Sequence, residues 1–385
     1  MMSTEFLQIF KKISTSLYST KNTASSDKIP LLYCEPGVSS GYRLEHQPVN
    51  FYLKSVFQIH NETINIWTHM IACLLVMIKT YSCVESLHDP NYAAVIYCFG
   101  ACCILYTALS AIAHTVHSKS PKFHYTCFQI DYMGIGYYTL GSSFLIYYTG
   151  CHQNYYAIFQ HVFLPSVVVM SWVGFVCCCI AKLRYRRSYP FQRKLWNLCS
   201  FGFQCTVVYS VLFARYYDCF MNKTLSSLNH HTIVCICILS SIVFFSSHIP
   251  EKFFPGKFDI LGQGHQIFHV LCSLGNLEQF NAAMIDIKHH TRLLTNHKPQ
   301  FSHMFTSILV YTGMVILTLT YLRYYTQNRI QSDIEFEKSR RKWYFCQHVH
   351  IHVICFLANT TGRISELLFY VRRRLYFSHI SLLRN

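Results

Sequence analysis

Long apolar segments constrain the fold of this chain more than any other feature of its sequence. They cover roughly residues 66–84, 93–113, 130–149, 157–181, 195–214, 229–247, 265–287 and 304–324. Each is close to the ~20 residues that an α-helix needs to cross a bilayer. The sequence therefore predicts an all-α multi-pass membrane protein, with a seven-helix bundle followed by an eighth, C-terminal transmembrane helix.

The composition supports this class of fold. Charged residues make up 13% of the 385 residues and hydrophobic residues make up 52%, whereas soluble domains carry about 25% charged residues. We expect a polar N-terminal arm at residues 1–60, the transmembrane bundle at residues 61–324 and a basic C-terminal tail at residues 325–385.

The net charge of +16 does not indicate nucleic-acid binding, because no nucleic-acid-binding motif is present. Basic residues lie mainly in the loops and tails, where they set topology and meet anionic lipid head groups. With a cytoplasmic N-terminus, ten loop lysines and arginines fall inside and five fall outside. The positive-inside rule thus favours a cytoplasmic N-terminus, and we expect a plasma-membrane protein with the bilayer as its surroundings.

Three polar blocks lie at the ends of apolar segments that are far apart in the sequence. They are HNETINIWTH at residues 60–69, the stretch from Ser110 through His114 to Asp131, and GHQIFH at residues 264–269. Counting the membrane crossings places all three blocks at the same face of the bilayer, whichever way the protein is oriented. Ionisable residues at membrane depth are usually functional, so this convergence predicts a site.

The spacing within these blocks suggests a metal. His265 and His269 are four residues apart and so lie on one face of a helix, and His114 could supply a third nitrogen. Asp131 could be a fourth ligand, hold a bound water or orient a ligand histidine. Three nitrogens with one open position are typical of catalytic zinc, whereas structural zinc has four protein ligands.

Other interpretations remain open at this point. The chain has 22 histidines, so a chance H-x-x-x-H pair is expected. In HNETINIWTH, Trp67 and His69 could be interfacial anchors, but a polar stripe of Glu62, Asn65 and His69 favours a structural hydrogen-bonding role. Several other histidines are expected to be solvated loop or tail residues, namely His117, His124, His230, His231, His348, His350 and His352.

The three blocks resemble the signature motifs of the progestin and adipoQ receptor family. The resemblance rests on HNETINIWTH, on S-x-x-x-H followed by DYMGI, and on PEKFFPGKFDI followed by GHQIFH. The eighth span and HSKSPKFHY resemble the membrane progestin receptor branch. The resemblance implies a zinc ion (Zn2+) held by His114, His265 and His269, with Asp131 in the position of the acid that holds the zinc-bound water.

Two functions follow from these observations. The first is a progestin-receptor-like signalling receptor that binds a steroid or related lipid in the bundle and engages cytoplasmic partners such as G proteins. The alternative is a zinc-dependent lipid amide hydrolase, similar to a ceramidase, that acts on a sphingolipid. In that case Asp131 is the general base and Ser110 contacts the oxyanion or the water. The sequence does not decide whether the protein is an enzyme.

Overall fold

A computed structural model describes residues 23–361, apart from short gaps at 153–155, 157, 160, 188–189, 223–227 and 291–297. Helices dominate the described residues, and a two-stranded antiparallel sheet pairs β1 with β2. The elements before the bundle are β1 (Thr23–Ala24), η2 (Leu31–Tyr33), β2 (Tyr42–Arg43) and α2 (Val49–Ser55). The bundle elements are α3 (Thr63–Glu85), α4 (Pro90–Val116), η3 (His117–Lys119), α5 (Pro121–Gly150), α7 (Phe163–Arg184), α8 (Phe191–Ser210), α9 (Phe213–Met221), α10 (Asn229–Ser247), α11 (Gly264–His290) and α12 (Phe301–Thr361).

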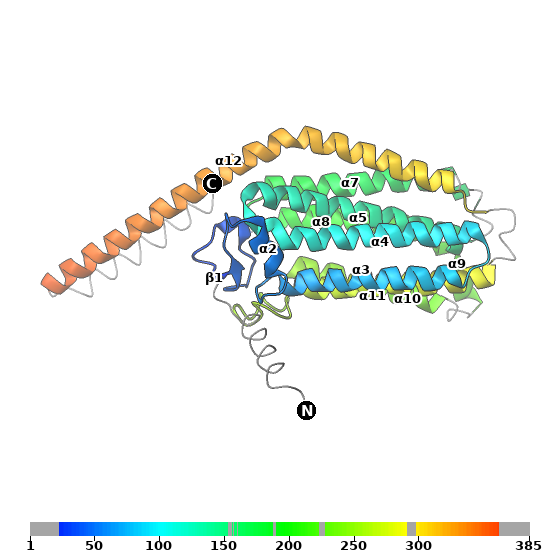
Figure 1. The fold of residues 1–385 in the computed structure, drawn as a ribbon, viewed down its shortest axis with the longest axis horizontal. Helices are drawn as coiled ribbons and strands as arrows, with labels where there is room; N and C mark the ends of the chain where they lie inside the picture. Colours follow the sequence, from blue (N-terminus) through cyan, green and yellow to red (C-terminus); the bar gives the residue numbers. More distant parts are fainter. Residues whose placement is uncertain are drawn as a thin grey trace, which may run out of the picture. The chain divides into compact units, whose positions relative to one another are not determined.

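These helices confirm the predicted all-α multi-pass class. Among the described residues, α3, α4 with η3, α7, α10 and the part of α12 at 301–343 are long and apolar enough to cross a membrane. The pair α8 and α9 also passes this test together, with a bend of 61°. Helices α5 and α11 run beside them in the bundle (Figure 1), and their polar residues are largely buried.

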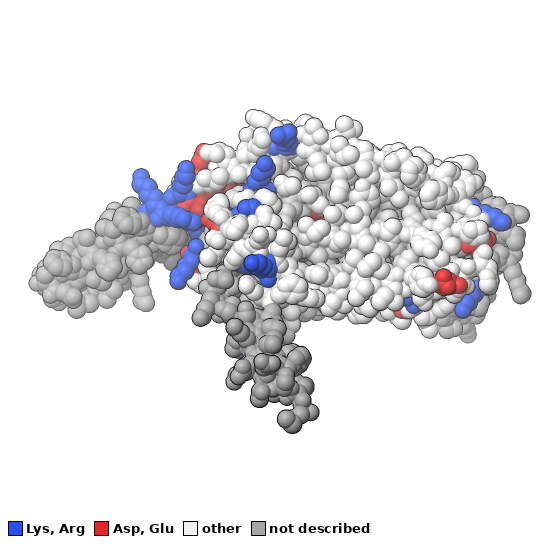
Figure 2. Space-filling view, in the orientation of Figure 1, with Lys and Arg blue, Asp and Glu red and all other residues white. Residues whose placement is uncertain are grey.

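The charged side chains are distributed as expected for a membrane-spanning bundle. Figure 2 shows that lysine, arginine, aspartate and glutamate gather towards the ends of the bundle, with almost none in the band between. That band exposes large apolar side chains on α3, such as Ile71, Leu74 and Ile78. An apolar belt of this kind is what a lipid-facing surface requires.

Two local signals fix the hairpin of α4 and α5. Asp89 caps α4 by accepting from the backbone N–H of Asn91 at 2.8 Å, and Ser120 caps α5 by accepting from Phe123 at 3.4 Å. A proline follows each cap at the first helical position, where its missing N–H costs nothing. The short turn η3 between the two helices therefore brings the end of α4 beside the start of α5.

The two helices also approach closely along their length. A Cβ atom placed on Gly141 of α5 would lie 2.6 Å from the Cβ atom of Cys102 in α4. Small residues that permit such close contact are typical of packed transmembrane helices.

Residues 23–62 pack against the end of the bundle where α4 finishes. Asp259, between α10 and α11, accepts from the backbone N–H of Ser39 at 2.8 Å and from the Ser40 hydroxyl at 2.6 Å. Arg43 donates to the carbonyl oxygens of His114 and Thr115, both at 2.6 Å. These contacts tie the N-terminal segment to two bundle elements.

The chain divides into two compact units, at residues 1–327 and 328–385. In the first, α12 packs on α5 and α7, with Tyr311 donating to the Met133 carbonyl at 3.1 Å and Trp172 donating to Thr318 at 2.9 Å. In the second, the described helix carries local ion pairs such as Arg329 with Asp333 at 3.3 Å. Residues 1–22 and 362–385 of the predicted arm and tail lie outside the described residues, and the predicted domain division stays a prediction.

Candidate metal centre

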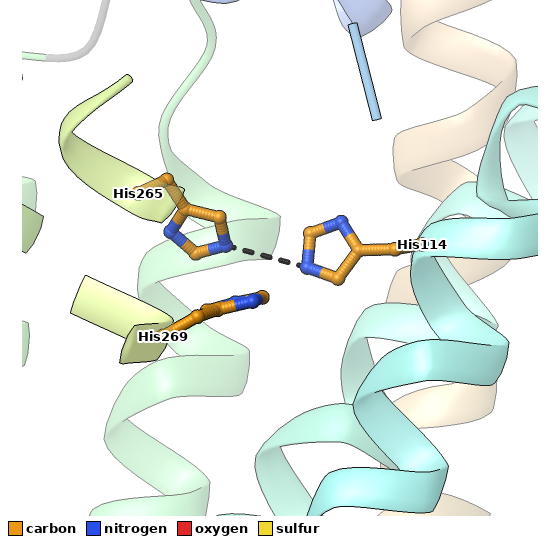
Figure 3. Close-up of side chains that lie close together, drawn as sticks. All are labelled: His114, His265 and His269. Carbon is orange, nitrogen blue, oxygen red and sulfur yellow. Dashed lines mark hydrogen bonds between the residues drawn. The ribbon is translucent and has the colours of Figure 1, made fainter. Parts of the chain in front are cut away.

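Three imidazoles, two of them buried and that of His265 partly buried, converge at one end of the bundle. His114 comes from the last turn of α4, and His265 and His269 come from the first turns of α11 (Figure 3). One ligand nitrogen from each ring lies within 4.8 Å of the others. The Nε2 atoms of His114 and His265 are 3.3 Å apart. The structure therefore brings together the three histidines that the sequence predicts as metal ligands.

This geometry fits a metal ion. Ligand nitrogens at 2.0–2.1 Å around a tetrahedral zinc ion lie about 3.3 Å from one another, which matches the separation between His114 and His265. The outward nitrogen of His114 contacts Glu62 at 2.8 Å, and Nδ1 of His269 contacts the Thr68 hydroxyl at 3.1 Å. The second nitrogens of ligand histidines normally make such contacts.

Glu62 is the main brace of this arrangement. Its Oε2 atom accepts from the Asn65 amide at 2.7 Å and contacts His114 Nδ1 at 2.8 Å, while Oε1 lies 3.3 Å from His117. Burial raises the pKa of the Glu62 carboxyl, but His114 and His117 outweigh it and hold the pKa well below the usual 4.5. Glu62 is therefore a carboxylate that fixes which nitrogen of His114 faces the centre.

Glu62, His114 and His117 also form a second group with metal-ligand spacing. Their closeness is explained by the carboxylate brace, because Glu62 contacts each histidine through a different oxygen. Arg43 adds to the same support by holding the end of α4 through its carbonyl oxygens.

Ser110 and Asp131 lie beside each other in the cavity that holds the three histidines. The cavity has a volume of about 130 Å³. Ser110 is one helical turn before His114 on α4, and Asp131 is on the facing side of α5. All five residues that the sequence singles out are therefore in one place, although their roles remain predictions.

The first polar block divides into two parts. Glu62 and Asn65 make the structural hydrogen bonds that the sequence led us to expect. His69 instead stacks on His269 with ring centroids 3.7 Å apart and an angle of 14°. Both of its ring nitrogens are buried without a hydrogen-bond partner, so it does not belong to a polar stripe with Glu62.

The expectation that His117, His124 and His231 are solvated was wrong. Each is at most 4% exposed. The tight turn η3 places His117 under the N-terminal segment, and the ring of His124 meets Tyr33 edge-on at 5.4 Å. His231 contacts Asp286 at 2.8 Å. The histidines at 348, 350 and 352 lie in a stretch whose side chains are not described.

A second, more apolar chamber adjoins the cavity of the histidines. It has a volume of about 100 Å³ and shares Phe201, Phe245 and Phe268 with the first cavity. Its few polar groups include Gln204, whose Oε1 accepts from Thr139 at 3.1 Å. The two spaces together offer one polar end and one apolar end.

Comparison with known proteins gives the family. A family model described as haemolysin-III related matches residues 57–280, a range that contains the three polar blocks. The chain belongs to this family. The match confirms the family membership inferred from the blocks.

Relatives of known name support the same branch. Membrane progestin receptor beta of Sus scrofa is 34% identical over 296 residues, covering 75% of this chain and 83% of the relative. Membrane progestin receptor beta of Mus musculus is 33% identical over 315 residues, covering 80% and 89%. Membrane progestin receptor alpha of Homo sapiens is 29% identical over 322 residues, covering 80% and 90%. The resemblance to the membrane progestin receptor branch is thus also confirmed.

Proposed function

We propose that this protein is a membrane receptor that binds a steroid or related lipid inside its helix bundle, beside a zinc ion held by His114, His265 and His269. The observation that carries the proposal is the cavity of the three histidines and its adjoining apolar chamber. The printed names of the relatives, which are membrane progestin receptors, support the choice of ligand.

The apolar chamber has the character that a steroid requires. Its walls come from aromatic and aliphatic side chains of α5, α8, α10 and α11, and burial of fused rings against such walls is favourable by about 25 cal/mol per Å². Gln204 supplies an amide there, and a polar group of this kind fixes the orientation of a mostly apolar ligand.

Zinc supplies positive charge that polarises a ligand oxygen when it is bound at the three histidines. The chain itself does the positioning. Glu62 orients His114, and Thr68 contacts His269. The stacked ring of His69 limits the movement of His269.

Binding of labelled progesterone to the purified full chain in detergent tests this proposal. We expect saturable binding by the wild type and roughly tenfold weaker binding by Gln204→Leu, because one orienting hydrogen bond is lost. Thr206→Val is the matched control, since Thr206 lies on the exposed face of the same helix. Absence of saturable binding to the zinc-loaded wild type would overturn the steroid proposal.

A second candidate function is a zinc-dependent lipid amide hydrolase. The observation that favours it is the pairing of Ser110 and Asp131 in the cavity of the three histidines. In this proposal Asp131 takes a proton from a water molecule, and the Ser110 hydroxyl, which donates to Asp131, turns to the oxyanion or the water when a substrate is bound. Ceramide turnover by the wild type and its loss in Asp131→Asn are expected. A zinc-loaded wild type without turnover would reject this candidate.

We also propose a plasma-membrane protein with a cytoplasmic N-terminus that signals to cytoplasmic partners such as G proteins. Loop cations support the orientation. Epitope tags at the two termini, read by antibody with and without permeabilisation of cells, test it. An N-terminal tag that is accessible in intact cells contradicts it.

A further inference from the structure

His69 of α3 lies in the wall of the cavity of the three histidines, and its ring has unused hydrogen-bonding capacity. The side chain is 1% exposed and lines this cavity. Both ring nitrogens are buried without a hydrogen-bond partner, which holds for no other histidine among the residues that the structure describes. A polar group buried without a partner destabilises a fold, so the presence of an imidazole here requires a reason.

Contacts with two other rings hold the His69 side chain at this wall. It stacks on His269 with ring centroids 3.7 Å apart, and Tyr106 meets it at an angle with centroids 5.3 Å apart. His69 is not one of the three residues whose ligand nitrogens lie within 4.8 Å of one another. Its ring therefore lies beside the candidate metal centre without belonging to it.

Asn65, one helical turn before His69 on α3, has an unpartnered atom at the same cavity. Its Nδ2 donates to Glu62 Oε2 at 2.7 Å. Because a carboxylate can only accept, this contact fixes which way round the amide lies. The Oδ1 atom of Asn65 is then an acceptor, and it is buried without a partner. Asn65 also lines the cavity.

Other polar groups of this cavity are paired within the chain. Ser110 is hydrogen-bonded to Asp131, and Glu62 is engaged by His114 and Asn65. The wall formed by α3 is different, because it offers one donor and one acceptor nitrogen of a neutral imidazole and, about one turn away, an amide oxygen. A ligand group that both accepts and donates hydrogen bonds matches this wall.

We propose that His69 is a ligand-contacting residue of this cavity, which donates a hydrogen bond to a carbonyl oxygen of the bound lipid, while the Asn65 amide oxygen accepts from a donor beside that carbonyl. The ligand class is thus a lipid in which a carbonyl and a hydroxyl or amide N–H are neighbours. The inference rests on the proposed function, because it requires a lipid in this cavity.

Binding of labelled progesterone to purified His69→Phe tests the contact with the carbonyl. Phenylalanine keeps a ring that can stack on His269, but it neither donates nor accepts a hydrogen bond. We expect roughly tenfold weaker binding than for the wild type, because one hydrogen bond inside the cavity is lost. Bound zinc should not change, since His69 is not in the metal group. Unchanged affinity overturns the proposal.

The unfolding temperature of the zinc-loaded, ligand-free protein separates a ligand contact from a structural role. His69→Phe should raise this temperature, because it removes two buried nitrogens that have no partner. A residue that only supports His269 would give the opposite result. A lower unfolding temperature or a loss of zinc in His69→Phe therefore overturns the proposal.

Two further variants control for the change of side chain. Glutamine both donates and accepts, so His69→Gln should recover part of the affinity that His69→Phe loses, and an affinity no better than that of His69→Phe counts against the hydrogen bond. Leu74→Phe is the matched control, because Leu74 is 53% exposed on the same helix. We expect it to bind as the wild type does, and an equal loss in Leu74→Phe overturns the assignment to His69.

A pair of steroids tests the ligand class. Deoxycorticosterone is progesterone with a hydroxyl added next to one of its carbonyls, so it supplies the donor that Asn65 requires. We expect the wild type to bind it about fivefold more tightly than progesterone, because one more hydrogen bond forms. Equal or weaker binding of deoxycorticosterone overturns the ligand class.

Short-chain ceramide separates this inference from the receptor proposal, because its amide places an N–H beside a carbonyl without a steroid. If neither steroid binds to the zinc-loaded wild type, but ceramide binds and His69→Phe weakens that binding roughly tenfold, the steroid is rejected and the His69 contact is supported. Progesterone binding that His69→Phe leaves unchanged does the reverse. Failure of all three probes to bind rejects both.

Discussion

The two ends of the helix bundle both bury polar side chains, but they do so in opposite ways. At one end Arg215 of α9 donates to the two oxygens of Asp286 at 2.8 and 3.0 Å, and His231 contacts the same carboxylate at 2.8 Å. At the other end His114, His265 and His269 face one another with no carboxylate between their facing nitrogens. About 26 Å of α11 separates His269 from Asp286.

The difference shows which buried polar cluster can be a site. Asp286 has a cation and a histidine, and Arg215 also donates to the Gly150 carbonyl at 3.0 Å, so this cluster is satisfied by the chain alone. Neutral imidazoles whose lone pairs face one another are satisfied only when a cation or a proton donor lies between them. The cluster around Asp286 therefore joins helices, whereas the cluster of three histidines can hold a metal ion.

Changing His265 and His269 together to alanine is expected to have the largest effect. Bound zinc should fall from about one equivalent per chain to none, because one nitrogen is too few to hold the ion. Metal analysis of the purified protein measures this. His303→Ala is the control, since His303 is exposed at the start of α12, and stoichiometric zinc in the double variant would refute the assignment.

Asp286→Asn should lower the stability of the protein without changing its zinc content. It leaves Arg215 buried without its carboxylate, and breaking a buried ion pair costs about 3–5 kcal/mol of unfolding free energy, while zinc content stays unchanged. Thermal unfolding in detergent measures the loss. Asp218→Asn is the comparison, because that side chain is 48% exposed. A variant that loses zinc but keeps its unfolding temperature would contradict the division between the two ends.

The helices and the convergence of the histidines could be predicted from the sequence. Apolar length identifies α3, α4, α7, α10 and the first part of α12 as spans, but not α5 and α11. The parity of the predicted crossings places His114, Asp131 and His265 at one face before any contact is known. Parity gives only the face of the membrane at which these residues lie. The close contact of α4 with α5 at Gly141 also sets the distance between the two helices.

Residues that act through long-range contacts could not be predicted. Arg43 lies in a polar arm, and nothing in its sequence context indicates that it holds the end of α4. Arg215 follows an apolar segment, so the sequence predicts an outer-loop cation there. In the structure, the 61° bend between α8 and α9 accompanies a buried ion pair of Arg215 with Asp286. Burial of His124, at the start of α5, depends likewise on the N-terminal segment, which is distant in the sequence and brings Tyr33 against its ring.

Glu62→Gln is expected to lower the zinc affinity at the end of the bundle that carries the three histidines. The amide can no longer attract the proton of His114 Nδ1 as a carboxylate does, and loss of such a partner costs roughly ten- to hundredfold in metal affinity. Competition with a chelator measures the zinc affinity. Glu62→Asp, which keeps the charge, should recover part of the loss. Glu85→Gln, at an exposed position at the end of α3, should have no effect. Unchanged affinity in Glu62→Gln would show that Glu62 only stabilises the fold.

The smallest effect concerns His248, which lies near Lys194 and Glu35 at the same end of the bundle. Burial, together with Lys194 and the two nearby arginines and against Glu35, lowers its pKa from 6.5 to about 4. As pH falls from 6.5 to 4 the unfolded chain therefore takes up a proton that the folded chain refuses, and the unfolding free energy decreases. His248→Asn should remove this part of the decrease, because asparagine does not titrate and tolerates the positive φ of 54° at this position. Thermal unfolding of both proteins across this pH range measures the difference, and parallel curves would show that the pKa of His248 is not lowered in the folded protein.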